Sequence, residues 1–246
     1  PNMQRIVMTG KDLSQFPQDS EGGYIKLVFP TPGEIALPSV EDIEAGAPIQ
    51  LRTYTIRGFD SDSLEMTVDL VLHDRQDHTG PAANWAKHAV AGDTMVIYGP
   101  GNVKPLNHNA DWFLLAADMT ALPAISCQLE SMPADANGYV IIEINSEADK
   151  QSLSKPEKME IIWVINPHSD QENTVLSDAV KSVPWLEGKP SIWAACEFSN
   201  MRLLRAYFKK DKQVAREYLY VSSYWKMGQA EDKHKIAKRI DAEAEG

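Results

Sequence analysis

The sequence predicts a β + α/β protein with two domains. Residues 1–107 carry short strand-like segments divided by proline and glycine turns, with one brief helical stretch, a pattern typical of a small antiparallel β-barrel. Residues 108–246 alternate compact apolar runs with helical stretches, which predicts a doubly wound parallel sheet and a C-terminal helix. The Gly/Pro/Asn-rich segment Gly101–Asn109 separates the two patterns, so we expect the domain boundary there.

Strands dominate the predicted N-terminal domain. The clearest is Leu64–His73, where every even position from 64 to 72 is apolar, so that one face of the strand is buried. Residues 30–50 hold four prolines and two glycines and are predicted to form a loop. Helical character is confined to Asn84–His88. The other predicted strands are Arg5–Met8, Tyr24–Phe29, 51–57 and Thr94–Tyr98.

Parallel strands are expected wherever the second domain has a compact apolar run. These runs are Trp112–Ala117, Tyr139–Ile144, Glu160–Ile165, Ser191–Ala195 and Glu217–Ser222. Helices are predicted at Ala121–Ser131, Asn173–Val183 and Asn200–Lys212, with a charged final helix at Gln229–Glu245. Residues 145–158 are too short and polar a segment to predict a helix.

Composition excludes several classes of function. The 246 residues carry a formal net charge of −11, which argues against a nucleic-acid partner and against an anionic membrane surface. No apolar run approaches the length of a membrane span, and the start lacks a basic-then-apolar signal. Cys127 and Cys196 form no CxxC pair and the histidines show no ligand spacing, so no disulfide framework, iron–sulfur cluster or metal site is predicted. We expect a cytoplasmic monomer.

One stretch, RTYTIR at 52–57, combines aromatic, hydroxyl and guanidinium groups. Arg52 offers a planar fork suited to a phosphate. Tyr54 offers a flat ring that can lie along a planar heterocycle, and Thr55 places a hydroxyl on the opposite face of a strand. Together these groups can grip a dinucleotide at its phosphate and its ring end. The alternative is an ordinary half-buried strand.

A loop rich in small residues follows the strand that ends at His73. Residues 80–86 read GPAANWA, and small side chains let the backbone approach a ligand. A helix starting near Ala82 would direct free N–H groups at a phosphate. The alternative is a plain strand-to-helix turn with proline in the first helical turn.

Taken together, the motifs resemble the siderophore-interacting proteins, flavin-dependent ferric-siderophore reductases of the ferredoxin-reductase superfamily. The resemblance covers nearly the whole chain. It rests on RTYTIR at 52–57, LVLH at 70–73, GPAANWA at 80–86, GD at 92–93, DMTALPAI at 118–125, Ala-x-Glu at 195–197 and YWKMG at 224–228. No G-x-G-x-x-G occurs, which argues against a plain Rossmann dehydrogenase.

Three positions depart from the family pattern. Ala117 replaces the glycine that precedes the Asp-x-Thr-Ala-Leu-Pro-Ala motif, and Asp74 stands where glycine usually follows His73, in a loop that looks extended. Cys196 also occupies a place that glycine usually holds. Asp74 and Cys196 lie beside positions that the resemblance assigns to cofactors, although Cys196 is equally understood as a small buried hydrophobe.

The resemblance implies an enzyme that passes electrons from NADH, NADPH or a ferredoxin through FAD to Fe(III) in a siderophore, releasing Fe(II). The flavin performs the chemistry, so no catalytic side chain is implied, although Thr55 and Thr120 would lie near it. Trp225 would cover part of the cofactor, or else anchor the core. The implied cofactor contacts are Arg52, Thr53, Tyr54, Thr55, Val71, Leu72, His73, Gly80, Pro81, Ala82, Ala83, Trp85, Thr120 and Trp225.

The anionic ferric siderophore is expected to need a local basic pocket. Arg57, Lys104 and Lys226 are the candidates for siderophore binding, and the alternative is that each is an ordinary surface cation. Neither the siderophore nor the electron donor is fixed by the sequence.

Two other functions stay open. One is a general NAD(P)H–flavin oxidoreductase with another acceptor, and the other is a non-enzymatic siderophore-binding protein with an empty flavin site. A yellow protein would exclude the second, and a strong preference for ferric chelates over quinones or dyes would exclude the first. Arg202, Arg205 and Arg216 only suggest a site for the 2′-phosphate of NADPH.

Overall fold

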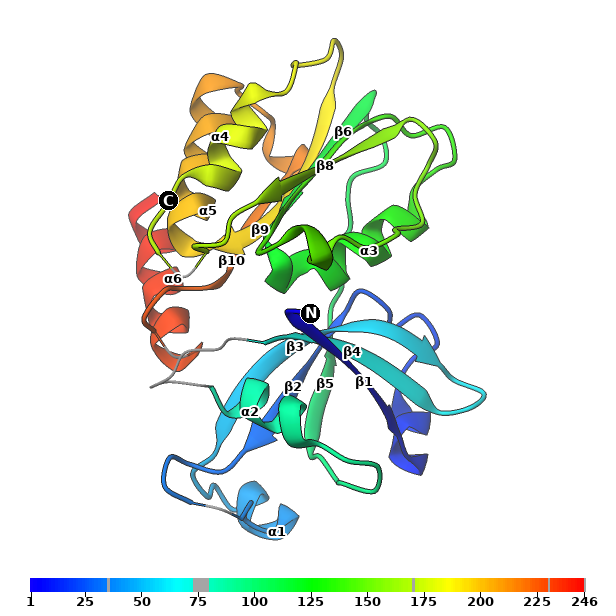
Figure 1. Ribbon diagram of the computed structural model, residues 1–246, viewed down its shortest axis with the longest axis vertical. Helices are drawn as coiled ribbons and strands as arrows, with labels where there is room; N and C mark the ends of the chain where they lie inside the picture. The colour runs from blue at the N-terminus through cyan, green and yellow to red at the C-terminus, as the bar shows by residue number, and fades with distance from the viewer. Residues whose placement is uncertain (35, 73–79, 170, 230, 246) are drawn as a thin grey trace. The chain divides into compact units, whose positions relative to one another are not determined.

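The computed structural model describes residues 1–34, 36–72, 80–169, 171–229 and 231–245 (Figure 1). Its chain divides into two compact units, Asn2–Val103 and Lys104–Gly246, with Pro1 assigned to the second. Each unit contains one five-stranded sheet. We call them the N-terminal unit and the C-terminal unit and describe each by itself.

The N-terminal unit is an antiparallel sheet in the order β1-β4-β3-β2-β5. Its strands are β1 (Met3–Thr9), β2 (Tyr24–Phe29), β3 (Gln50–Asp60), β4 (Glu65–Val71) and β5 (Ile97–Gly101). Its α-helices are α1 (Val40–Glu44) and α2 (Pro81–His88), and a 3₁₀-helix covers Lys11–Gln15. The predicted antiparallel architecture is confirmed; pairing of β1 with β5, which would close a barrel, is not among the ladders of the described residues.

Strand β3 changes partner along its length. Its first half pairs with β2, from Gln50 opposite Phe29 to Thr55 opposite Tyr24. Its second half pairs with β4, beginning at Ile56 opposite Val68. Side chains from both halves enter one apolar core, in which Ile25, Leu27, Ile56, Met66, Val68 and Leu70 are fully buried. Residues 52–55 are therefore hydrogen-bonded to β2 along one edge, and they precede the part of β3 that pairs with β4.

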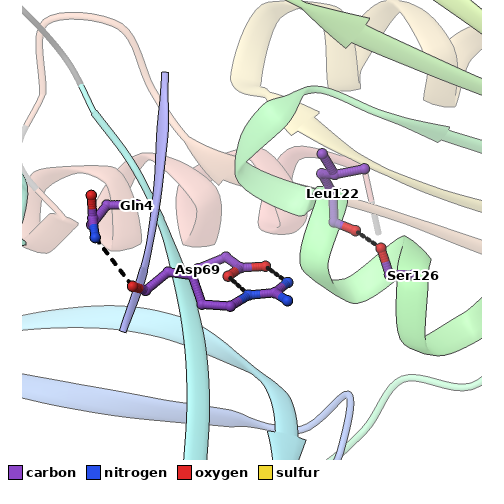
Figure 2. A network of polar contacts seen from close by, with 5 residues as sticks. Gln4, Asp69, Leu122 and Ser126 are labelled. Carbon is purple, nitrogen blue, oxygen red and sulfur yellow. Dashed lines mark hydrogen bonds and ion pairs between the residues drawn. The ribbon is translucent and has the colours of Figure 1, made fainter. Parts of the chain in front are cut away.

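A charged pair fixes the register of β1 against β4 (Figure 2). Arg5 and Asp69 stand opposite each other, and the guanidinium donates from Nε to Oδ1 at 2.7 Å and from Nη2 to Oδ2 at 2.8 Å. The Asp69 side chain is 4% exposed and that of Arg5 is 55% exposed. This bidentate geometry satisfies a buried carboxylate from the outer strand, and it would be lost if the two strands slipped by one residue.

The C-terminal unit is a parallel sheet in the order β10-β9-β6-β7-β8, as predicted. Its strands are β6 (Trp112–Ala117), β7 (Gly138–Ile144), β8 (Met159–Ile165), β9 (Pro190–Glu197) and β10 (Leu219–Trp225). Its helices are α3 (Leu122–Ser131), α4 (Val175–Ser182), α5 (Phe198–Ala206) and α6 (Glu231–Glu245). Chain order reverses at β6, which pairs with β7 on one side and β9 on the other.

Helices cover both faces of this parallel sheet. Figure 1 shows α3 on one face and α4 and α5 on the other. The α4/α5 face buries Trp112, Leu114 and Ala116 of β6 together with residues of β9 and α5. All six residues of β6 are buried, as expected for the central strand of a sheet covered on both sides.

Three predicted elements are corrected by the structure. The predicted loop 30–50 contains α1, because Ser39 caps it by accepting a hydrogen bond from Asp42 N and the first turn is acidic. Strand β5 begins later than the predicted Thr94–Tyr98 and continues through Gly101, which packs directly on Tyr24. A Cβ at Gly101 would lie 2.0 Å from the Tyr24 ring, so glycine permits this pairing.

The predicted helix Asn200–Lys212 is also adjusted. Helix α5 begins at Phe198, where the Glu197 side chain caps it, and its α-helical part ends at Ala206. A π-helical turn, Tyr207–Asp211, completes the segment. The remaining strands and helices of the C-terminal unit lie where the sequence predicts them, within three residues at each end.

Replacement of Gly138 by alanine should destabilise the protein strongly. Gly138 begins β7 with φ +136°, and a Cβ there would lie 1.9 Å from the carbonyl oxygen of Phe113. We expect Gly138→Ala to lower the free energy of unfolding by about 3 kcal/mol or more, measured by equilibrium urea denaturation.

Gly228→Ala is the matched control, because Gly228 has φ +69° but open space around the position of a Cβ. It should lower the free energy of unfolding by about 1 kcal/mol, the effect of the backbone conformation alone. Equal costs at the two positions would show that the contact with Phe113 is not the cause.

Candidate functional site

The predicted phosphate-binding strand is part of β3. Arg52 is half-buried, and its guanidinium donates to the Leu51 carbonyl at 2.8 Å and to Gln50 Oε1 at 3.0 Å. These two bonds hold the guanidinium beside the start of β3 and use two of its five N–H donors. Tyr54 packs against the apolar core, Thr53 is exposed and Thr55 is 8% exposed.

Helix α2 begins where the sequence predicts a phosphate-binding turn. Gly80 is its N-cap residue, Pro81 occupies the first turn, and Ala82 and Ala83 are buried. Asn84 N donates back to the Gly80 carbonyl at 3.0 Å, so the N–H groups of Ala82 and Ala83 precede the first bond within the helix. The first turn contains no acidic side chain. Such a terminus presents backbone donors and a partial positive charge to an anion.

Helix α2 and the start of β3 lie at the same end of the N-terminal sheet. Phe29 pairs with Gln50 in the β2–β3 ladder, and its ring meets that of Trp85 on α2 with centroids 6.3 Å apart. Arg52 follows Gln50 by two residues on β3. The N-terminal unit therefore contains a guanidinium and a helix N-terminus, two kinds of donor that suit the pyrophosphate of a dinucleotide such as FAD.

Other predicted cofactor contacts have different surroundings. Trp85 packs against the apolar core, so that its ring has a structural role whether or not it also meets a ligand. Val71 is 8% exposed, and Leu72 donates its backbone N–H to the Asn2 carbonyl at 2.9 Å. His73 lies outside the described residues.

In the C-terminal unit, Thr120 and Trp225 meet at a single carboxylate. Asp118 directly follows β6 and is 8% exposed. Its Oδ1 accepts hydrogen bonds from Thr120 N at 2.9 Å and Thr120 Oγ1 at 2.5 Å. Its Oδ2 accepts from Trp225 Nε1 at 2.7 Å and from Glu197 N at 2.8 Å. Burial raises the pKa of Asp118, while these four hydrogen bonds act to lower it.

Two more buried carboxylates lie near the same edge of the parallel sheet. Glu143 is 5% exposed and accepts from Asn166 Nδ2 at 2.8 Å. Burial raises its pKa to about 7, the Asn166 bond opposes that rise, and the charge of Asp118 adds to it. Glu197 caps α5 through Ser199 N and accepts from Met227 N at 3.2 Å. Within the described ranges, no three His, Cys, Asp or Glu side chains are arranged to hold a metal ion.

Cys196 lies next to this edge and faces the α4/α5 core. It is 1% exposed, and burial followed by the charges of Asp118, Glu143 and Glu197 raises the pKa of its thiol far above the ordinary range. The interpretation of Cys196 as a small buried hydrophobe is confirmed, since a protonated, inaccessible thiol is a poor nucleophile.

The three predicted siderophore cations are divided between the two units. Arg57 is half-buried on β3 of the N-terminal unit. Lys104 is exposed in the C-terminal unit, where its carbonyl accepts from Trp193 Nε1 at 3.0 Å. Lys226 Nζ lies 4.6 Å from the centroid of the Phe198 ring, a cation–π contact. Their siderophore-binding roles stay predictions.

Two of the arginines considered for a 2′-phosphate already have a carboxylate partner. Arg202 Nε lies 3.3 Å from Asp241 Oδ1, and Arg205 also pairs with Asp241 on α6. Helix α6 is thereby tied to α5. The structure favours a structural role for both arginines.

Sequence reasoning included Asp118 and Glu197 in motifs but did not predict that they and Glu143 are buried carboxylates at one edge of the sheet. Each had a visible signal, because an acidic residue follows or interrupts a strongly apolar run in all three cases. For Glu143 the run is VIIEI, at the end of β7. The sequence pattern does not identify the hydrogen-bond partners of these carboxylates. The donors to Asp118 come from segments 79 and 107 residues away as well as from Thr120.

One antiparallel and one parallel sheet, with donors that suit a phosphate in the first unit, are the features of a two-unit protein that could bind a dinucleotide. Residues 1–104 match the family model of the siderophore-interacting FAD-binding domain, and residues 110–228 match that of the siderophore-interacting protein. The chain therefore belongs to the siderophore-interacting protein family, as its motifs predict.

Relatives and solved structures agree with this assignment. The ferric vibriobactin reductase ViuB of Vibrio cholerae is 34% identical, over 97% of this chain and 89% of that protein. The crystal structure of the siderophore-interacting protein SipS from Aeromonas hydrophila is 30% identical, covers 99% of this chain and 93% of its own, and has a TM-score of 0.83. A ferredoxin-NADP+ reductase from Plasmodium falciparum, 12% identical, covering 90% of this chain and 88% of its own with a TM-score of 0.62, shares the fold. Across the described helices, none is long and apolar enough to cross a membrane.

Replacing Glu143 by glutamine should change how stability depends on pH. The folded pKa, about 7, lies above the ordinary value of 4.5, so between these values the folded protein keeps a proton that the unfolded chain has released. Stability therefore falls as pH rises through this window. Glu143→Gln keeps the acceptor for Asn166 and should raise the free energy of unfolding at pH 8 by roughly 1–3 kcal/mol.

Equilibrium urea denaturation at several pH values from 4.5 to 8 would measure this effect. The matched control is Glu160→Gln, an exposed position on the neighbouring strand β8, which should leave the curve unchanged. An unaltered pH dependence in Glu143→Gln would contradict the prediction.

Proposed function

We propose that this protein is an FAD-dependent reductase of ferric siderophores that releases iron as Fe(II). The observation that carries the proposal is that both units match the family in order. The Arg52 guanidinium and the acid-free start of α2 support it, because both suit a phosphate. The similarity to a ferric vibriobactin reductase supports the reaction type. The expected domains are an FAD-binding barrel, residues 1–107, and an NAD(P)H-binding-like domain, residues 108–246.

The N-terminal unit supplies the groups that would hold FAD. Arg52 would bind a phosphate with its remaining guanidinium N–H groups, and the N–H groups of Ala82 and Ala83 would bind the pyrophosphate. Tyr54 and Thr55, on opposite faces of β3, would contact the flavin. Gly80 leaves open space where a Cβ would stand, so a phosphate can approach the backbone there.

FAD, when bound, supplies the redox chemistry, because it accepts a hydride and can release electrons singly. The protein's residues need only bind and orient the reactants and keep them in range. The substrate iron takes one electron, and the resulting Fe(II) is held less tightly by the oxygen donors of a siderophore, which promotes release. Arg57, Lys104 and Lys226 would attract the anionic chelate.

The C-terminal unit would receive the electron donor, which is NADH, NADPH or a ferredoxin. Thr120 and Trp225 lie at the carboxyl ends of β6 and β10, beside the place where chain order reverses, and ligands of open parallel sheets bind at such positions. We place the protein in the cytoplasm as a monomer, which is consistent with two free cysteines.

Two other functions make different predictions for the same measurements. A general flavin reductase would reduce quinones or dyes as fast as ferric chelates. A siderophore-binding protein without flavin would purify colourless and would not bind FAD. The residues of the N-terminal unit favour a flavoprotein, because they include the Arg52 guanidinium, the Tyr54 ring and a helix α2 whose first turn contains no acidic side chain.

Anaerobic stopped-flow absorbance at the oxidised-flavin band near ~450 nm tests the proposed reaction. We expect NADH or NADPH to bleach the band and a ferric catecholate or hydroxamate to restore it. Bleaching only by a reduced ferredoxin would identify a protein donor. A protein that binds no flavin, or a reduced flavin that iron chelates do not reoxidise, would overturn the proposal.

Removal of the Arg52 guanidinium tests the cofactor site. Arg52→Ala should weaken FAD binding by about 10- to 100-fold, the effect of losing a charge-assisted contact. The dissociation constant would be measured from the change in FAD fluorescence on titration of the apoprotein.

Lys87→Ala, in the last turn of α2, is the control and should change FAD binding less than about threefold, because that end of the helix faces no phosphate in this arrangement. Similar effects in both variants would indicate non-specific attraction of an anion, and an unaffected Arg52→Ala would place the phosphate elsewhere.

A further inference from the structure

The Asp118 carboxylate joins the ends of three strands in the C-terminal unit. Asp118 itself follows β6, Glu197 ends β9 and Trp225 ends β10. Backbone or side-chain donors from all three places converge on its two oxygens. Each oxygen accepts two hydrogen bonds, Oδ1 from Thr120 and Oδ2 from Glu197 N and Trp225 Nε1.

The four hydrogen bonds to Asp118 favour an ionised carboxylate. Both oxygens face donors that include two backbone N–H groups and an indole N–H, none of which can accept a hydrogen bond. An asparagine amide at this position would present one oxygen and one NH₂ group. Turned toward Thr120, its NH₂ would oppose the Thr120 backbone N–H; turned the other way, it would oppose the N–H groups of Glu197 and Trp225. An isosteric but uncharged asparagine therefore leaves at least one of these donors without its acceptor.

A second carboxylate, that of Glu197, binds the segment that follows β10. Glu197, whose backbone N–H bonds to Asp118, uses its own side chain to cap α5 and to accept from Met227 N at 3.2 Å. The β9–β10 register shifts between Ser223 and Trp225, so regular strand pairing alone does not fix Trp225. Hydrogen bonds to the two carboxylates therefore add to the strand pairing in holding Trp225 and Met227.

We propose that Asp118 is a positioning residue for electron transfer from the donor. It fixes the plane of the Trp225 indole and the direction of the Thr120 hydroxyl, the two groups at this edge that would meet a ring of the donor. The inference rests on the proposed function. It assigns Asp118 no contact with a ligand: its effect is transmitted through Trp225 and Thr120, which would otherwise be free to adopt several rotamers.

The hydrogen bond to Trp225 can be tested without any flavin chemistry. In ¹⁵N-labelled protein, the indole N–H of Trp225, assigned by its loss in Trp225→Phe, should exchange with solvent slowly. Asp118→Asn should accelerate that exchange about tenfold or more, as expected for loss of a buried hydrogen bond. Asp149→Asn is the matched control, because Asp149 is also buried and accepts from Ser146 N and Oγ, yet has no bond to an indole.

The positioning role is tested by separating the two half-reactions. Asp118→Asn should lower the rate of flavin bleaching at saturating donor about tenfold, while the dissociation constants of FAD and donor change less than threefold. Reoxidation of chemically reduced protein by a ferric chelate should be unaffected. A variant that lost FAD, donor binding and both half-reactions together would show that Asp118 is merely structural and would overturn the inference.

If Asp118→Asn does not fold, Thr120→Val provides the second variant. It removes one donor to Oδ1 and leaves the bond to Trp225, so the indole should stay protected while bleaching slows. Rapid exchange of the Trp225 indole in the wild-type protein would overturn the inference at once. Failure of the proposed function is distinguishable, since then no donor bleaches the wild-type flavin although the indole remains protected.

Discussion

The reversal of chain order at β6 is the constraint on which the C-terminal unit depends. Strand β6 pairs with β7 on one side and β9 on the other, and the chain leaves these two central strands toward α3 and α5 on opposite faces. The pairing of β6 with β9 ends at Ala117 opposite Ala195, so β9 continues to Glu197 without a hydrogen-bonded partner residue on β6. Asp118 supplies the missing acceptor for Glu197 N. The places of Thr120 and Trp225 follow from the same carboxylate.

The sequence was sufficient to predict elements whose signal is local. Strand β6 was predicted with its observed bounds because an uninterrupted apolar run is what a central parallel strand requires. The bounds of β5 were predicted wrongly because glycines such as Gly99 and Gly101 normally end a strand. Here Gly101 stays in the strand, because it pairs with Tyr24 and leaves room for the Tyr24 ring. Helix α1 was missed although its Ser39 cap and acidic first turn were visible, since the surrounding prolines dominated the interpretation.

The residues of the candidate site also divide into those that a short motif predicts and those whose contacts depend on the fold. Arg52, Tyr54 and the start of α2 could be found because each lies in a short motif whose residue types suit a dinucleotide. The bond from Trp225 to Asp118 could not, because it spans 107 residues and depends on which strands become neighbours. Hydrophobic periodicity identifies strands without giving their order in the sheet. The acidic residue within VIIEI was the available clue that this edge carries buried charge.

In each unit, the charge around the candidate residues limits which kind of ligand group could lie against them. The start of α2 and Arg52 offer N–H donors and positive charge, which stabilise phosphates. The carboxyl edge of the parallel sheet contains the buried carboxylates Asp118, Glu143 and Glu197, so a phosphate placed against it would meet repulsion at low dielectric. An uncharged or cationic ring would meet the Trp225 indole and the Thr120 hydroxyl there without that cost. In the proposed function, the carboxylate that holds these two groups would therefore also favour a ring over a phosphate at this edge.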